Sequence, residues 1–259
     1  MSSSIVETLI GYLNTMPPEM VWGLLLITCF TTVILLDKLF GYVGLYIYIA
    51  VAIISANIQV LKAVKFSIYT DPVALGTILF ASTYLASDIL SEKYGTKIAR
   101  QAIWLGFSAF FLFAVLMIIT LGFSPLTEQQ AGEAMAWALP YHGHIAALFT
   151  PQMNFLLAGM LAYLVSQMND IWLFDKLRQK TQRRYLWLRN NVSTLVSSFI
   201  DNVVFSVFAW IVLASEPLPW QTVIVTYILG TYWLRLIIAV LDTPFIYLAC
   251  TDAPVTATS

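Results

Sequence analysis

Charged residues are scarce in this chain of 259 residues, at 10% of the total, whereas soluble domains carry about 25%. Hydrophobic residues make up 59% of the chain, and the mean hydropathy is +0.80. A soluble fold could not cover so much apolar surface, so the sequence predicts a polytopic membrane protein. The net charge of −1 excludes a generally basic nucleic-acid-binding protein, and we expect no nucleic-acid partner.

The motifs of common catalytic sites are also missing from the sequence. It contains no G-x-x-x-x-G-K-[ST], H-E-x-x-H or G-x-S-x-G pattern, which argues against a P-loop nucleotidase, a metalloprotease and a lipase. Cys29 and Cys250 lie in apolar stretches and indicate no disulfide framework. His142 and His144 lack nearby acids or thiols, so an exposed loop is favoured over a metal site. We expect no enzyme, cofactor or metal.

Seven apolar stretches approach the roughly 20 residues that a spanning helix needs. They are Val21–Leu36, Leu45–Leu61, Val73–Leu90, Ala102–Phe123, Gln152–Phe174, Val192–Leu213 and Trp220–Cys250. The last is long enough to need a strong tilt or a break, and Pro244 is a candidate kink. Residues 127–139 suggest a short amphipathic helix at an interface. The sequence thus predicts an all-α integral membrane protein.

The positive residues give an orientation to these seven spans. Ten of the thirteen fall on one side: Lys38, Lys93, Lys97, Arg100, Lys176, Arg178, Lys180, Arg183, Arg184 and Arg189. Lys62 and Lys65 fall on the other side, and Arg235 lies within the last span. Because basic residues concentrate in cytoplasmic loops, we expect the N-terminus outside and the C-terminus in the cytoplasm. Dismissing the weak first span would leave an even count.

Four charged residues within the spans are informative, because each costs about 2.5–3.5 kcal/mol in hydrocarbon unless it is paired or hydrated. They are Asp88, Asp201, Arg235 and Asp242. Asp88 lies near the cytoplasmic end of its span, where it could simply reach the interface. Asp201 lies deep, where the alternatives are a salt bridge to Arg235 and a functional cavity, and we favour the cavity. Arg235 and Asp242 share one helix face, two turns apart.

Uncharged polar side chains follow the same spans. Asn190, Asn191, Thr194, Ser197, Ser198 and Asp201 recur at intervals of three and four, which forms one hydrophilic stripe. Gln167 and Asp170 are more scattered on the preceding span, and Asn57 interrupts an apolar helix. One or two such residues would serve as interhelical hydrogen bonds, but so many indicate the walls of a polar pocket.

Three stretches together resemble the queuosine precursor transporter family, also called the vitamin uptake transporter family. They are ASTYLASDILSEKYGTKIAR (81–100), LAYLVSQMNDIWLFDKLRQKT (161–181) continuing into WLRNNVSTLVSSFIDNVVF (187–205), and YWLRLIIAVLDTPFIYLA (232–249). The family is similar to the substrate-binding components of energy-coupling-factor transporters. The resemblance implies a six-helix transporter bundle that imports 7-deazaguanines (queuine or its 7-cyano and 7-aminomethyl precursors) for tRNA modification across the bacterial inner membrane.

On this resemblance we divide the chain into an outside N-terminal segment (1–20), an extra transmembrane helix with its turn (21–44), the six-helix core (45–250) and a disordered cytoplasmic tail (251–259). The substrate-binding residues implied are Asn57, Asp88, Gln167, Asp170, Asn191, Ser193, Asp201, Arg235 and Asp242. Position 235 is often Lys in such sequences and is Arg here.

A deazaguanine edge presents N–H donors beside a carbonyl, which carboxylates and amide or guanidinium groups complement. We assign Asp201 or Asp88 to the donor edge, and Asn57, Gln167 or Asn191 to the remaining edge. Arg235 and Asp242 are assigned to gating or charge balance.

Two other functions remain open. The chain could carry another small solute, or it could be a binding subunit that needs a partner ATPase docked on the basic loop 175–189. An enzyme using paired acids such as Asp88 and Asp170 is disfavoured, since no metal or nucleophile accompanies them. Membrane lipid is an expected partner, and the sequence leaves open whether the chain forms a homodimer.

Overall fold

The computed structural model describes residues 4–67, 73–149 and 153–251. The helices of this part are α1 (Ile5–Thr15), α2 (Pro18–Phe40), α3 (Tyr42–Gln59), α4 (Thr77–Lys93), α5 (Thr96–Leu121), α6 (Glu128–Ala131), α7 (Tyr141–Phe149), α8 (Met153–Lys180), α9 (Leu186–Val207), α10 (Trp220–Thr222) and α11 (Gly230–Cys250). Ala136–Ala138 (η1) is a 3₁₀ turn, while Phe208–Val212 (η2) and Val223–Leu229 (η3) are π-helical. The all-α class is confirmed.

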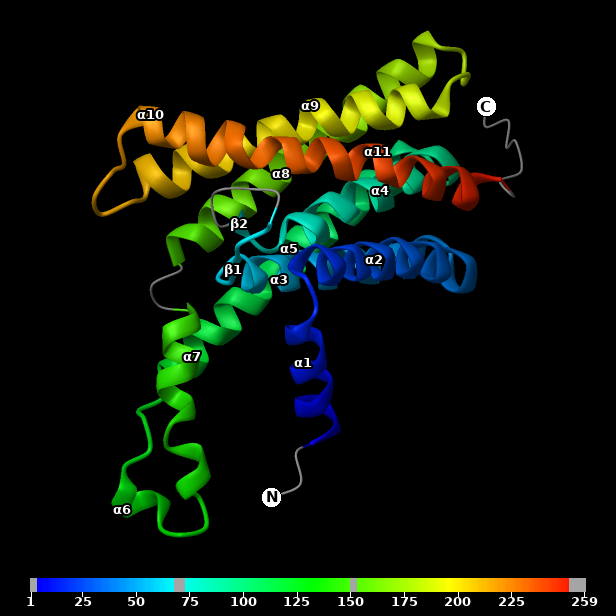
Figure 1. The fold of residues 1–259 in the computed structure, drawn as a ribbon. Coiled ribbons are helices and arrows are strands. Elements are labelled where there is room, and N and C mark those ends of the chain that lie inside the picture. Colours follow the sequence, from blue (N-terminus) through cyan, green and yellow to red (C-terminus); the bar gives the residue numbers. More distant parts are fainter. Residues whose placement is uncertain (1–3, 68–72, 150–152, 252–259) are drawn as a thin grey trace.

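The bundle consists of long helices that run alternately in opposite directions along its axis (Figure 1). They are α2, α3, α4, α5, α8, α9 and α11. Its tight turns lie at one end, together with the end of α11. Gly41, with φ of 60°, joins α2 to α3, and Gly95, with φ of 89°, lies between α4 and α5. Only glycine adopts such backbone angles freely. A third turn at this end joins α8 to α9. All ten basic residues that the sequence places on one side flank these three turns, so we call this end of the bundle the basic end.

Five helical segments are long and apolar enough to cross a membrane: Pro18–Phe40, Tyr42–Gln59, Thr96–Leu121, Leu186–Val212 and Trp220–Cys250. Asn154–Lys180 qualifies as a sixth when joined to Ala136–Phe149, from which it is bent by 48°. The helix α4 has 17 residues and is the most buried of the long helices. Thirteen of its residues, all between positions 78 and 91, are buried. The protein is therefore a multi-pass membrane protein, and the count of seven spans stays a prediction.

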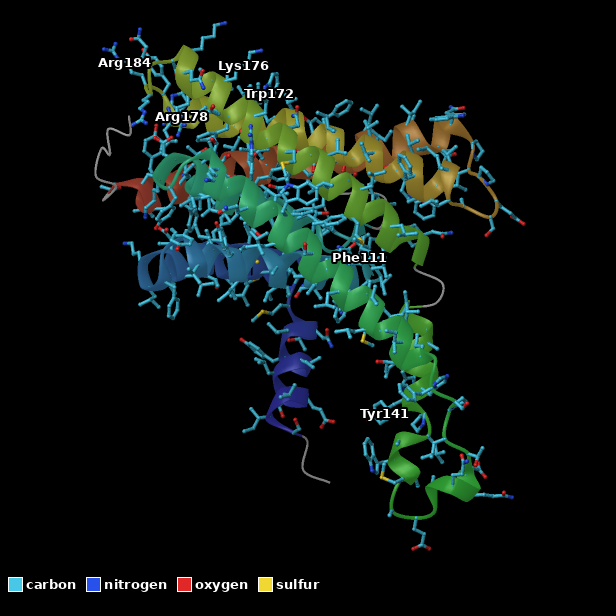
Figure 2. All side chains as sticks on the ribbon, turned by 180° about the vertical axis from the view of Figure 1, so that it is seen from behind. Phe111, Tyr141, Trp172, Lys176, Arg178 and Arg184 are labelled. Carbon is cyan, nitrogen blue, oxygen red and sulfur yellow. The ribbon has the colours of Figure 1, made fainter. Side chains whose placement is uncertain are left out.

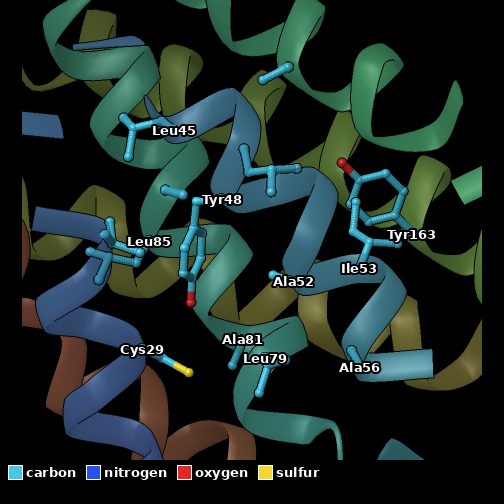
Figure 3. Packing of buried hydrophobic residues seen from close by; sticks show 14 of the residues in the cluster. Cys29, Leu45, Tyr48, Ala52, Ile53, Ala56, Leu79, Ala81, Leu85 and Tyr163 are labelled. Carbon is cyan, nitrogen blue, oxygen red and sulfur yellow. The ribbon is translucent and has the colours of Figure 1, made fainter. Parts of the chain in front are cut away.

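The first long helix is packed into the bundle. Its partners are α3, α4 and α11, and Figure 3 shows Cys29 of α2 beside Tyr48 of α3 and Leu85 of α4. The Tyr48 hydroxyl donates to Ser82 Oγ at 2.6 Å, which satisfies a buried phenol in an apolar layer. Near the basic end, Asp37 of α2 accepts hydrogen bonds from Lys93 and from the Tyr94 hydroxyl.

Two segments depart from the sequence-based expectations. The stretch predicted as a helix from Val73 begins as a two-residue strand, since β2 (Val73–Ala74) pairs with β1 (Ala63–Val64). The helix starts after Gly76, whose φ of 100° and contact with the Ala56 carbonyl admit no side chain. Residues 127–139 form α6 and η1 rather than one amphipathic helix, because Gly132 ends α6 with a φ of 54°.

The N-terminal segment also contains a helix that the sequence did not reveal. Ser4 and Glu7 form a capping box at the start of α1. This helix projects crosswise to the bundle, and the α6–α7 arm projects in the same general direction (Figure 1). The predicted disordered tail, apart from Thr251, lies outside the described residues, as does the predicted start of the fifth span at Gln152.

Candidate functional site

A cavity of about 400 Å³ lies in the half of the bundle away from the basic end. The β1–β2 hairpin, α4, α8, α9, the two π-helical segments and the start of α11 all contribute to its wall. Ligand pockets in proteins generally measure about 300–1,000 Å³ and combine apolar walls with a few polar groups. The volume and the mixed lining make this the candidate binding site.

An ion pair forms the charged part of the cavity wall. Arg235 of α11 donates from Nη1 to Asp201 Oδ2 of α9 at 2.6 Å, and Asp201 Oδ1 accepts from Ser166 Oγ of α8 at 3.2 Å. The pair is nearly buried, with side chains 10% and 8% exposed. Asp201 thus pairs with Arg235 and both residues line the cavity, while the functional role of that cavity stays a prediction.

Further polar groups stand beside this pair. Asn202 Nδ2 donates to the Ile228 carbonyl and to Thr231 Oγ1, both at 3.1 Å. Arg235 Nε and Trp210 Nε1 are buried N–H groups for which no described residue accepts a hydrogen bond. A buried donor without a partner costs about 1–3 kcal/mol, and here both donors belong to cavity-lining residues. A ligand with acceptor groups would recover that cost.

Aromatic side chains make up much of the remaining wall. Trp210 lies 4.5 Å from Tyr227 between ring centroids and 4.9 Å from Phe155, which in turn stacks on Phe205 at 6.3 Å. Phe80 of α4 lies on the wall as well. Aromatic faces arranged in this way accept a flat, unsaturated ring.

Two π-helical turns carry the central aromatic pair. In η2 the Leu213 N–H bonds to the Phe208 carbonyl five residues back, and in η3 the Gly230 N–H bonds in the same way to Val225. Trp210 belongs to the first segment and Tyr227 to the second. Isolated π turns are uncommon and occur frequently at functional sites.

A second polar region lies toward the basic end, separate from the cavity wall. Asp88 of α4, Asp170 of α8 and Asp242 of α11 are at most 1% exposed, and we call them the acidic cluster. Asp88 interacts electrostatically with both other acids. Asn190 Nδ2 donates to Asp242 Oδ1 at 2.7 Å, while Ser87 Oγ lies 3.5 Å from Asp170 Oδ2. Asp170 was overlooked as a charge within a span, although it is wholly buried.

The residues predicted as one substrate site therefore divide between several places. Asp201 and Arg235 line the cavity, and the acidic cluster with Ser193 lies apart from it. Asn57 sits directly behind the cavity-lining Gly159, and Gln167 donates to Thr83 at 2.7 Å. Asn191 donates to the Trp187 carbonyl and to Thr243, both at 2.8 Å. The structure thus brings two of the nine to the cavity wall.

Several wall residues were not singled out from the sequence. They are Phe80, Phe155, Asn202, Phe205, Trp210, Tyr227 and Thr231. The chain has 8 Trp and 13 Tyr, most of which suit interfacial positions, so composition could not select the few that face a ligand. Asn202 could have been inferred from the sequence, because it directly follows Asp201, which lies deep within its span.

A bundle of apolar helices around a partly charged cavity is typical of membrane transport proteins. A family model described as "Putative vitamin uptake transporter" matches residues 74–249. The chain therefore belongs to the vitamin uptake transporter family, as the sequence resemblance indicates.

One curated relative gives a more particular comparison. The chain is 30% identical over 229 residues to the "Probable queuosine precursor transporter" of Bacillus subtilis (strain 168). The match covers 88% of this chain and 93% of that relative. No solved structure matches the chain.

Proposed function

We propose that this protein imports queuosine precursors, the 7-deazaguanines queuine, 7-cyano-7-deazaguanine or 7-aminomethyl-7-deazaguanine. The family and the name of the relative from Bacillus subtilis support transport of this kind. The observation that carries the proposal is the cavity, in which an acid, buried N–H donors and aromatic faces meet. The acid, the N–H donors and the aromatic faces complement the donor groups, the carbonyl group and the flat ring of the base, respectively.

Each group of the base has a candidate partner on the wall. The ring N–H and exocyclic NH₂ are donors that a carboxylate can accept together, which suits Asp201. The ring carbonyl is an acceptor for the unpartnered Arg235 Nε or for Trp210 Nε1. The flat bicyclic ring fits against Trp210 and Tyr227, whose planes are inclined by 34°. Asp88, which the sequence offered as an alternative to Asp201, lies outside this wall.

The topology is part of the same proposal. Seven spans, with the N-terminus outside and the C-terminus in the cytoplasm, would put the basic end inside and the cavity toward the outside. Residues 45–250 would form the six-helix core and 21–44 the extra helix with its turn. Contacts of α2 with three core helices support a stabilising role for that extra helix.

Uptake in a suitable host tests the proposal directly. The host lacks both precursor synthesis and its own transporter, receives a low concentration of one deazaguanine, and is scored for queuosine in tRNA on a boronate gel. A shifted tRNA band is expected with this chain, and Asp201→Ala is expected to abolish it while the protein remains in the membrane. No shift with wild-type protein in the membrane would contradict the proposal, and wild-type uptake by Asp201→Ala would refute the role of Asp201.

The second candidate is a binding subunit that depends on a partner ATPase. Figure 2 shows Trp172, Lys176, Arg178 and Arg184 together at the basic end of α8 and α9. However, Arg189 is buried against Glu92 at 2.7 Å, and Arg178 bonds to Asp175 and to the Ser91 carbonyl. This basic loop therefore offers fewer free cations than its sequence suggests. Co-purification with an ATPase would favour this candidate, and uptake by the chain alone would exclude it.

A further inference from the structure

The acidic cluster contains several buried oxygen atoms that receive no well-aligned hydrogen bond. Both carboxyl oxygens of Asp88, Oδ1 of Asp170, Oδ2 of Asp242 and Oδ1 of Asn190 are buried and receive no well-aligned hydrogen bond from a described residue, although serine hydroxyls, those of Ser87, Ser193 and Ser197, interact with Asp170. The three acids and Asn190 are at most 1% exposed. Buried acceptors are nearly always satisfied in proteins, so five such oxygens in one region call for donors or for positive charge.

The cations around the cluster are already committed to other groups. On the elements that pack against it, the charged pairs are Arg189 with Glu92 at 2.7 Å, Arg235 with Asp201 at 2.6 Å, Arg178 with Asp175 at 2.6 Å and Lys93 with Asp37 at 2.5 Å. Lys38, Lys97 and Arg100 are exposed at the basic end, and α3 carries no charged residue. Three carboxylates would therefore face one another without a counterion of their own.

A bound metal ion does not fit this arrangement. Among the residues that the structure describes, no group of three or more His, Cys, Asp or Glu side chains is placed to hold a metal ion. Protons can instead supply the hydrogen-bond donors that the buried oxygens lack. A protonated carboxyl group becomes a hydrogen-bond donor to the neighbouring acid, and closely spaced acids titrate as a unit because they cannot all ionise at once.

The cluster is also connected to the cavity. Ser166, which donates to Asp201, lies one turn of α8 before Asp170. Tyr84 of α4 is 2% exposed and interacts electrostatically with both Asp201 and Asp170. A ligand that draws Asp201 away from Ser166 or from Arg235 would change the field at the cluster through these two residues.

We propose that Asp88, Asp170 and Asp242 form a proton-binding site, and that a proton bound there accompanies the substrate of the cavity across the membrane. The step is reversible: a carboxylate takes a proton when the site faces the outside and releases it to the cytoplasm. The proton site stands on the cluster alone, whereas its coupling to substrate rests on the proposed function.

Infrared spectroscopy of the purified wild-type protein tests the proton site without substrate. A protonated carboxyl group has a C=O stretching band that a carboxylate lacks. We expect this band to persist at neutral pH in wild-type protein and to shrink in Asp88→Asn, Asp170→Asn or Asp242→Asn. The control Asp175→Asn removes an ion-paired acid near the basic end and should leave the band unchanged. Absence of the band from wild-type protein at neutral pH would overturn the proposal, even if every variant failed to fold.

Proteoliposomes test the coupling. With a pH-sensitive dye inside, addition of 7-cyano-7-deazaguanine to wild-type vesicles should acidify the lumen, and Asp170→Asn should take up the base without acidification or not at all. Uptake by wild-type protein without acidification would overturn the coupling. Failure of wild-type protein to bind the base would refute the proposed function and its coupled proton together, while the infrared band would still decide the proton site.

Discussion

The cavity and the acidic cluster both place acids deep in an apolar bundle, but they treat them in opposite ways. Asp201 has an arginine, a serine hydroxyl and open space beside it. Asp88 faces two further acids, and the hydrogen-bonding partner that the described residues offer it is another carboxyl group, that of Asp170. Burial alone therefore does not identify a ligand site. The difference lies in whether a counterion and a space accompany the buried charge, which suits the first region to a polar solute and the second to a proton.

The largest expected effect is on stability, through the ion pair of the cavity. Arg235→Gln leaves Asp201 as a buried charge without its cation, which costs about 3–5 kcal/mol. The matched control is Arg178→Gln, because the partly exposed Arg178–Asp175 pair at 2.6 Å is worth about 0–1 kcal/mol. Thermal unfolding in detergent should show a much larger fall for Arg235→Gln, and Asp201→Asn added to it should recover part of the loss. Equal falls in unfolding temperature for Arg235→Gln and Arg178→Gln would contradict the description of the Arg235–Asp201 pair as a buried ion pair.

Trp210→Ala should have the next largest effect, on ligand affinity. Stacking of a base on an aromatic side chain is worth about 1–3 kcal/mol, so the dissociation constant for 7-cyano-7-deazaguanine should rise at least about fivefold. Trp172→Ala provides the control, since Trp172 is exposed at the basic end beneath Lys176. Calorimetry on purified protein measures both. The same affinity in the two variants would remove Trp210 from the site.

Gly159→Ala should displace the α8 wall of the cavity. A Cβ at this position would lie 2.6 Å from Asn57 Oδ1, so Asn57 or the helix must shift. Overpacking of this kind costs about 1–3 kcal/mol, partly offset by the gain of about 0.5–1 kcal/mol from replacing a helical glycine. Gly23→Ala meets nothing within 4 Å and should only stabilise. Uptake should fall in the first variant and recover when Asn57→Ala is added; unchanged uptake in Gly159→Ala would mean that this wall does not contact the substrate.

Asp242→Asn should have the smallest effect on substrate affinity. It alters the acidic cluster, and Asn190 can still donate to the new amide oxygen, so the base should bind within about twofold of wild type, or about 0.4 kcal/mol. Equilibrium binding of radiolabelled base provides the measurement. A loss as large as that of Trp210→Ala would mean that the two regions form one binding site, as the sequence alone suggested.

The sequence identified the membrane class and singled out Asp201 and Arg235 because hydrocarbon imposes strong rules. A charge such as Asp201 or Arg235 is expensive in a span, so its presence alone made it informative. The nine predicted site residues were nevertheless treated as one site. Sequence periodicity gives the face of each helix but not the depth at which faces from different helices meet, so Asp170 and Asp242 were grouped with the cavity residues.

Other features had no clear sequence signal. Trp210 and Tyr227 belong to a class of residue that is common at membrane interfaces, and the π-helical turns that hold them follow no hydrophobic period. The strand pair at Ala63–Val64 and Val73–Ala74 is too short for an alternating pattern. Buried pairs such as Arg189 with Glu92 were missed because both residues lie in segments that otherwise read as basic loops and helix ends.

The π-helical segment at the start of the last span has a consequence for hydrophobic matching. Residues 220–250 form one continuous apolar segment of 31 residues, which as a regular α-helix would measure about 46 Å at 1.5 Å per residue. The hydrocarbon core is about 30 Å thick. The wide turns of Val223–Leu229 place more residues in each turn and so shorten this part of the span. Its 7 residues would measure about 10 Å as a regular helix, so the π turns absorb a small part of the surplus, at the depth where Tyr227 lines the cavity. Tilt of the helix, or extension of its ends beyond the hydrocarbon, takes up the rest.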